Sequence, residues 1–118
     1  MTLPSFGVFA KQPLSESLVD CATIFSITTR AYPERQTKKS IALSSAERVL
    51  LQAAENRARA ENRPLAQSYI AKLVIEKQTH WDARGVDFIF TDEFRDWASY
   101  CRALSNELGI DLKGIASN

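Results

Sequence analysis

The sequence predicts a mainly α-helical protein with a short β-ribbon. Residues 44–61, 64–78 and 92–108 each place apolar side chains at helical spacing. Residues 38–43 instead alternate between apolar and polar side chains, as a strand with two different faces does. One short strand cannot satisfy its own backbone hydrogen bonds, so the ribbon requires a second copy of the chain, and the expected unit is a homodimer.

The composition indicates a protein that works in water. Of its 118 residues 45% are hydrophobic, and no apolar run approaches the roughly 20 residues that a membrane-spanning helix needs. The first residues also lack the basic region, apolar stretch and small-residue cleavage site of a secretory signal. We therefore expect a cytoplasmic protein without a membrane partner.

The net charge of +1 conceals an uneven distribution of charge. Residues 1–36 are balanced, residues 37–80 carry eight basic against four acidic side chains, and residues 81–118 carry four basic against seven acidic ones. Segments of opposite sign attract different partners. The basic middle is expected to meet a polyanion, and the acidic end something else.

The elements follow one another in this order along the chain. Prolines and a glycine disfavour regular structure up to about residue 14, and residues 23–29 favour a strand, although a helix over 15–25 is the alternative. Ser44 or Ser45 is suited to cap the first long helix, and Asn62-Arg63-Pro64 ends it. A linker over 79–86 leads to the last helix, between a capping Thr91 and Gly109.

The two cysteines, Cys21 and Cys101, are far apart in the sequence, and we expect them to be separate buried thiols. Together with His80 they lack the close ligand pairs that structural zinc sites use, so neither a metal nor a cofactor is expected. No Ser/His/Asp set or carboxylate pair beside a histidine is evident. The chain is therefore not expected to be an enzyme.

Residues 38–77, KKSIALSSAERVLLQAAENRARAENRPLAQSYIAKLVIEK, resemble the ribbon-helix-helix superfamily of DNA-binding proteins. Within it they are most similar to antitoxins that pair with acetyltransferase toxins of the GNAT fold. The later stretch DFIFTDEFRDWASYCRAL is similar to the region with which those antitoxins wrap their toxin. The resemblance implies a dimer whose paired strands enter the major groove of DNA.

The resemblance also implies two sets of site residues and a core. The core would include Ile41, Leu43, Leu50, Tyr69, Ile70 and Leu73. The DNA contacts would come from the strand and from the start of the second helix, whose free amides can hold a phosphate: Lys38, Lys39, Ser40, Ala42, Arg63, Leu65, Ala66, Gln67 and Ser68. The contacts to a partner protein would be Phe90, Phe94, Trp97, Cys101 and Leu104.

The expected organisation has three parts. Residues 1–36 form an N-terminal extension, 37–79 the DNA-binding module and 80–118 a partner-binding segment with one helix. The expected function is a transcriptional repressor that binds a double-stranded DNA operator, as the antitoxin that masks a toxin protein. Two alternatives remain open, a DNA-binding accessory protein of plasmid conjugation and a protein-binding inhibitor or adaptor that does not contact DNA.

Overall fold

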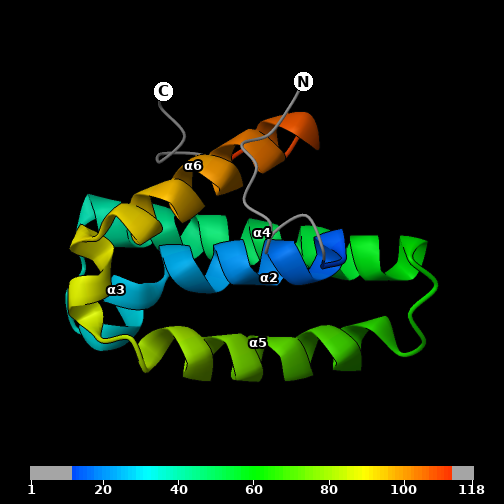
Figure 1. Cartoon of the computed structure of the whole chain (residues 1–118), viewed down its shortest axis with the longest axis horizontal. Helices are drawn as coiled ribbons and strands as arrows, with labels where there is room; N and C mark the ends of the chain where they lie inside the picture. Colours follow the sequence, from blue (N-terminus) through cyan, green and yellow to red (C-terminus); the bar gives the residue numbers. More distant parts are fainter. Residues whose placement is uncertain (1–11, 113–118) are drawn as a thin grey trace.

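The structure is a computed structural model that describes residues 12–112. Its elements are α2 (Leu14–Phe25), α3 (Ile27–Ala31), α4 (Lys38–Ala60), α5 (Ala66–Asp82), the short 3-10 helix η1 (Val86–Phe90) and α6 (Asp92–Glu107). Figure 1 shows α4 and α5 running antiparallel, with α2 packed along them and α6 crossing on the side away from α5. A mainly helical fold is confirmed, but residues 12–112 contain no strand, so the predicted β-ribbon is wrong.

The predicted strand forms the first turns of α4. Thr37 caps this helix: its side chain accepts a hydrogen bond from the Ser40 amide at 3.0 Å, and Ser40 Oγ accepts one from the Thr37 amide at 2.9 Å. This capping box satisfies two free amides and moves the helix start seven residues ahead of Ser45. Because the backbone groups of 38–43 bond within the helix, the backbone argument for a dimer no longer applies.

Helix α2 lies at the centre of the fold and packs against α4, α5 and α6. Its buried polar side chains are satisfied locally: Thr23 Oγ1 donates to the carbonyl of Val19 at 3.0 Å. Ser15 lies in the first turn, where its amide and hydroxyl both donate to the carboxylate of Glu61, at 3.1 and 2.6 Å. A carboxylate from the end of α4 therefore caps the start of α2.

Small side chains allow α2 and α4 to approach closely. Ala46, Leu50, Ala54 and Ala58 recur at four-residue spacing on α4, and each is at most 1% exposed. Alanine in three of these four positions leaves room for the backbone of α2, whose own interior positions are almost all buried. Truncating Leu50 within this seam would cost about 2–5 kcal/mol.

The remaining helices close the core from the other sides. Helix α5 buries Ile70, Leu73 and Trp81, and α6 buries Trp97 and Leu104, among other residues. Thr91 caps α6 as predicted, since its side chain accepts from the amide of Phe94 at 3.1 Å, and Gly109 follows the helix with a φ of 70°. The last turn of α5 occupies residues that were predicted to form a linker.

All three predicted segments contribute to a single hydrophobic core. The first segment supplies α2 and α3, the second α4 and α5, and the third η1 and α6. Residues 1–11 of the predicted N-terminal extension and 113–118 of the C-terminal segment lie outside the described range. Between residues 12 and 112, no helix is both long and apolar enough to cross a membrane.

Candidate binding groove

Two adjoining hollows lie between the α3–α4 corner and the η1–α6 corner, and together they are called the α3–α6 groove. Each has a volume of about 280 Å³, and they share Thr28, Lys39, Leu43 and Ile89. The first is also lined by Ile24, Phe25, Phe94, Ala98 and Arg102, and the second by Thr29, Tyr32, Arg35, Thr37 and Ser40. The groove thus has apolar walls with polar and charged groups along its rim.

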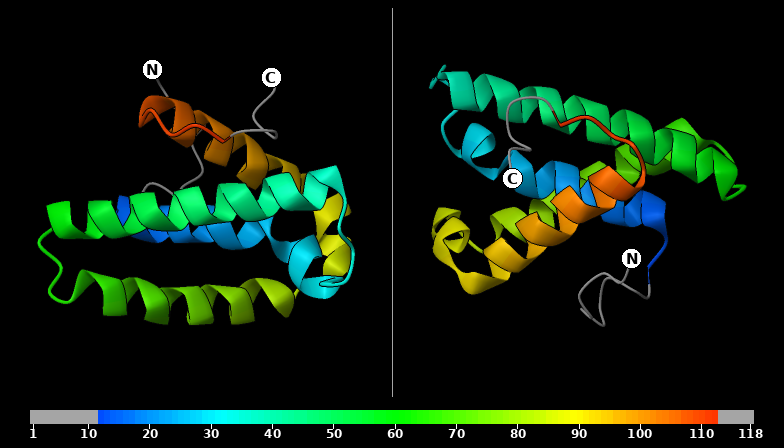
Figure 2. Two further views of the ribbon diagram at one scale, coloured as in Figure 1. Left: turned by 180° about the vertical axis from the view of Figure 1, so that it is seen from behind. Right: turned by 90° about the horizontal axis from the view of Figure 1, so that it is seen from above.

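Four elements position these side chains. The Thr37 capping box fixes the first turn of α4, which carries Lys39. Leu43 lies one turn further along the same helix and faces the groove. On the opposite wall, Ile89 comes from η1 and Arg102 from α6. Figure 2 shows α6 crossing the bundle obliquely, so that its beginning lies near α3 and η1.

The charged side chains that line the groove all have the same sign. They are Arg35, Lys39 and Arg102, and no aspartate or glutamate lines either hollow. Among residues 12–112, neither Lys39 nor Arg102 forms an ion pair, while the guanidinium of Arg35 lies 4.8 Å from the centre of the Tyr32 ring. The hydroxyl of Thr29 is buried and has no hydrogen-bond partner in this part of the chain. The groove therefore favours a ligand that is both apolar and negatively charged.

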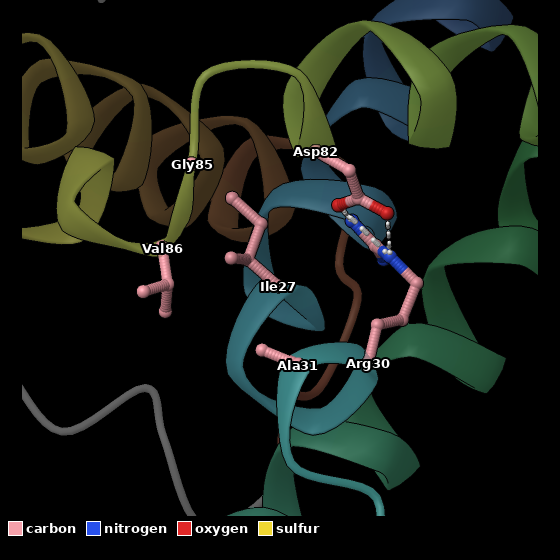
Figure 3. Close-up of a pocket in the computed structure, with 6 residues that line it drawn as sticks. All are labelled: Ile27, Arg30, Ala31, Asp82, Gly85 and Val86. Carbon is pink, nitrogen blue, oxygen red and sulfur yellow. Dashed lines mark hydrogen bonds and ion pairs between the residues drawn. The ribbon is translucent and has the colours of Figure 1, made fainter.

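A smaller hollow of about 200 Å³ lies on the other side of α3 (Figure 3). Its apolar surface comes from Ile27, Ala31 and Val86, and its rim from Arg30 and Asp82. These two charges already neutralise each other, because Arg30 donates to both carboxylate oxygens of Asp82 at 2.7–3.2 Å. The hollow consequently offers no free charged group to a ligand, unlike the α3–α6 groove.

A buried carboxylate links α2 to α5. Asp20 is 2% exposed, and its oxygens accept hydrogen bonds from the indole of Trp81 at 2.9 Å and the amide of Gln12 at 2.8 Å. Lys77 Nζ lies 3.2 Å from Asp20 and 2.9 Å from Glu16. Partial burial lowers the pKa of Lys77, but the hydrogen bond to Glu16 and the charge of Asp20 outweigh it, so that the pKa is raised overall. Because the charged groups of this cluster are paired with one another, the cluster holds α2 and α5 together and offers no free charge to a ligand.

Cys21 and Cys101 form a disulfide between α2 and α6, with their Cα atoms 5.6 Å apart. The prediction of two separate thiols is therefore wrong. Both residues belong to apolar helix faces that meet in the core, and each is 0% exposed. Cys101, predicted as a partner contact, is consequently buried in this bond. No group of three metal-ligating side chains occurs within residues 12–112.

The structure disperses the residues predicted to contact DNA. Lys38 and Lys39 are exposed at the start of α4, where Ser40 completes the capping box and Ala42 is half-buried. The others lie near the distant turn between α4 and α5. There Arg63, Gln67 and Ser68 are exposed, Leu65 is 80% exposed and Ala66 is buried. Without strands these side chains do not form a ribbon face, and DNA contacts remain a prediction.

The residues predicted to bind a partner divide into two groups. Phe90 is 77% exposed and Phe94 lines the groove, so both are accessible to a ligand. Trp97 and Leu104 are 5% and 3% exposed and belong to the core. Of the predicted core residues, Leu50, Ile70 and Leu73 are buried, Leu43 and Tyr69 are partly buried, and Ile41 is 58% exposed.

Lys39 was assigned to DNA, and Arg102 was not selected as a site residue. Both side chains line the same hollow because α4 and α6 each pack on α2, and the local sequence gives no signal for this arrangement. Comparison with protein-family models, curated protein sequences and solved structures gave no match.

Proposed function

We propose that the protein is a non-enzymatic binding protein of the inhibitor or adaptor class, and that its α3–α6 groove holds an acidic, apolar segment of a partner protein. The observation that carries this proposal is the combination of apolar walls with three basic and no acidic lining side chains. An antitoxin that masks a toxin is one member of this class.

A peptide segment suits the shape of the groove. The two hollows adjoin, so that apolar side chains from successive turns of a helix or alternate positions of a strand can occupy them. Leu43, Ile89 and Phe94 supply the apolar contacts, which provide most of the binding free energy. Lys39 and Arg102 then select acidic flanking residues and increase the rate of association.

The test uses a short synthetic helical peptide with leucine and phenylalanine four residues apart, flanked by glutamates. Fluorescence anisotropy measures its binding to the full chain, and a peptide with lysines in place of the glutamates is the control. We expect saturable binding of the acidic peptide that weakens with salt, and no binding of the basic one. The proposal is abandoned if both peptides bind equally or if neither binds at low salt.

Charge-reversal variants locate the binding site. The double variant Lys39→Glu, Arg102→Glu should weaken the acidic peptide about tenfold, since each exposed charge contributes up to about 1 kcal/mol. A glutamate at position 39 is compatible with the helix, because it lies in the first turn of α4, where negative charge is favourable. The matched control is Lys72→Glu, on the exposed face of α5 and outside the groove. If Lys72→Glu weakens peptide binding as much as the double variant does, the peptide binds outside the groove.

Duplex DNA provides the competing outcome. Operator binding rested on a ribbon that residues 38–43 do not form, so the predicted means of entering the major groove is absent. Titration with labelled duplex DNA at low salt tests it directly. Sequence-specific DNA binding together with no peptide binding would favour the repressor function over the present proposal.

A further inference from the structure

The disulfide lies directly behind one wall of the α3–α6 groove. Cys21 precedes Ile24 and Phe25 by one turn of α2, and both of these residues line the groove. Cys101 immediately precedes Arg102 and follows Ala98 by one turn of α6, and these two also line it. The bond therefore joins the floor of the groove to its α6 wall.

Besides the disulfide, a buried face that includes Trp97 and Leu104 attaches helix α6 to the core, and the ring of Trp97 contacts that of Trp81 on α5. The principal packing partners of α6 within residues 12–112 are α2 and the adjoining η1, whereas α2, α4 and α5 all pack extensively on one another. Figures 1 and 2 show that α6 crosses the three-helix bundle of α2, α4 and α5 on the side away from α5. Without the covalent link, α6 is the helix that should undock first.

We infer that formation of the Cys21–Cys101 bond assembles the binding groove, so that the protein binds its partner in an oxidising compartment and not in a reducing one. The inference rests on the proposed function, because it concerns the regulation of that same site. It differs from the expectation of a cytoplasmic protein, because it proposes a compartment in which disulfides persist.

The reaction requires a disulfide oxidant of the dithiol–disulfide exchange class. The Cys21 thiolate attacks the oxidant disulfide and forms a mixed disulfide, and one oxidant sulfur leaves as a thiolate. The Cys101 thiolate then attacks the Cys21 sulfur and expels the second oxidant thiolate. The two cysteines lose two electrons and two protons in total, and the oxidant is recovered as a dithiol.

Burial makes this change effectively one-way in the folded chain. Both cysteines are 0% exposed, so an attacking thiolate cannot reach either sulfur while α6 is docked. Oxidation before or during docking of α6 is then followed by closure of the core over the bond. The oxidised protein should keep its groove when it meets moderate concentrations of thiols.

The experiment compares three forms of the full chain: oxidised, reduced after unfolding and refolded under dithiothreitol, and the double variant Cys21→Ala, Cys101→Ala. Hydrogen exchange measures the protection of α6 against that of α4 and α5, and anisotropy measures affinity for the acidic peptide. We expect α6 to lose protection in both forms without the bond. If its docked population falls to about one tenth, the affinity should fall about tenfold.

Each result of the hydrogen-exchange and anisotropy measurements either supports or overturns the inference. Equal protection of α6 and equal affinity in all three forms would overturn the inference, leaving the bond as a stabilising link only. Complete unfolding without the bond would also overturn it, since the bond would then stabilise the whole fold and not the docking of α6 in particular. If the oxidised chain fails to bind the peptide, the proposed function fails, but the exchange of α6 amides still tests whether the bond assembles the groove.

Discussion

Replacing Asp20 with alanine should destabilise the protein strongly, although the residue does not line the groove. The carboxylate is 2% exposed, and it accepts hydrogen bonds from Trp81 Nε1 at 2.9 Å and Gln12 Nε2 at 2.8 Å. It also lies 3.2 Å from Lys77 Nζ. The variant Asp20→Ala removes the acceptor that these three donors share and leaves the buried indole N–H of Trp81 without a partner.

The size of the effect follows from what remains. The indole N–H of Trp81 stays buried without an acceptor, which costs about 1–3 kcal/mol. The side chain of Lys77 is 17% exposed and keeps its ion pair with Glu16 at 2.9 Å, so the loss of Asp20 from this cluster should cost only about 0.5 kcal/mol at Lys77. With the small void that the carboxylate leaves, the free energy of unfolding should fall by about 2–4 kcal/mol.

Urea unfolding followed by tryptophan fluorescence measures this change. A loss of this size should move the midpoint by about 1–2 M, given the usual slopes for small proteins. Asp20→Asn keeps an oxygen facing Trp81 and should lose about half as much, and Asp96→Ala on the exposed face of α6 is the matched control. A loss below about 1 kcal/mol for Asp20→Ala would refute the reasoning, because the buried donors would then have found other acceptors.

The same cluster predicts a dependence on alkaline pH. The raised pKa of Lys77 means that its pairing stabilises the fold fully below about pH 10.5, and that this contribution is lost as the pH rises through the folded-state value. The stability difference between wild type and Lys77→Met should therefore shrink at high pH.

Reducing the bond between Cys21 and Cys101 should lower the free energy of unfolding by about 4.5 kcal/mol, because the bond closes a loop with a sequence separation of 80 residues. Urea titration with and without reductant measures this loss, and a loss below about 1 kcal/mol would contradict the prediction. The hydrogen bond from Arg84 lowers the pKa of Glu93, so the wild type should be more stable than Glu93→Gln at neutral pH. This advantage should disappear as the pH falls through the pKa of Glu93, which thermal melts at pH 7 and pH 3 would show. The variant Thr29→Val removes a buried hydroxyl without a partner and should raise the free energy of unfolding by about 1 kcal/mol in urea titrations. A decrease in this free energy would mean that the hydroxyl has an acceptor.

The long helices were predictable because their signals are local. The apolar spacing of residues 92–108, Thr91 before them and Gly109 after them determine α6 almost to the residue. The turn between α4 and α5 falls at Asn62-Arg63-Pro64 for the same reason, since proline and the left-handed conformation of Asn62 interrupt any helix. These features act within a few residues and do not depend on the rest of the fold.

The strand predictions failed because helical alternatives were underestimated. Only Ile41 in residues 38–43 is β-branched, and Thr37 with Ser40 supplies a helix start that outweighs weak alternation. In α2 the hydroxyl of Thr23 bonds to a carbonyl one turn earlier, so a residue that favours strands becomes acceptable in a buried helix. The alternative helix over 15–25 was the correct one.

The disulfide and the groove depend on contacts between distant segments. Cys21 follows Leu18 on one apolar helix face, and Cys101 lies with Trp97 and Leu104 on another. Two cysteines on the buried helix faces of one small core predict a disulfide, but these faces can be identified only once both segments are known to be helical. The groove combines side chains from α2, α3, α4, η1 and α6, and no local sequence pattern predicts that these elements pack together.

The central position of α2 also governs how the protein can be made. A ribosome releases α2 before α4, α5 and α6, the described helices that pack on it, and the sulfur that pairs with Cys21 follows 80 residues later. Until α6 has been synthesised, part of the apolar surface of α2 lacks its partner. We therefore expect the core to close only after α6 has left the ribosome, and chaperones can protect the exposed apolar surface until then.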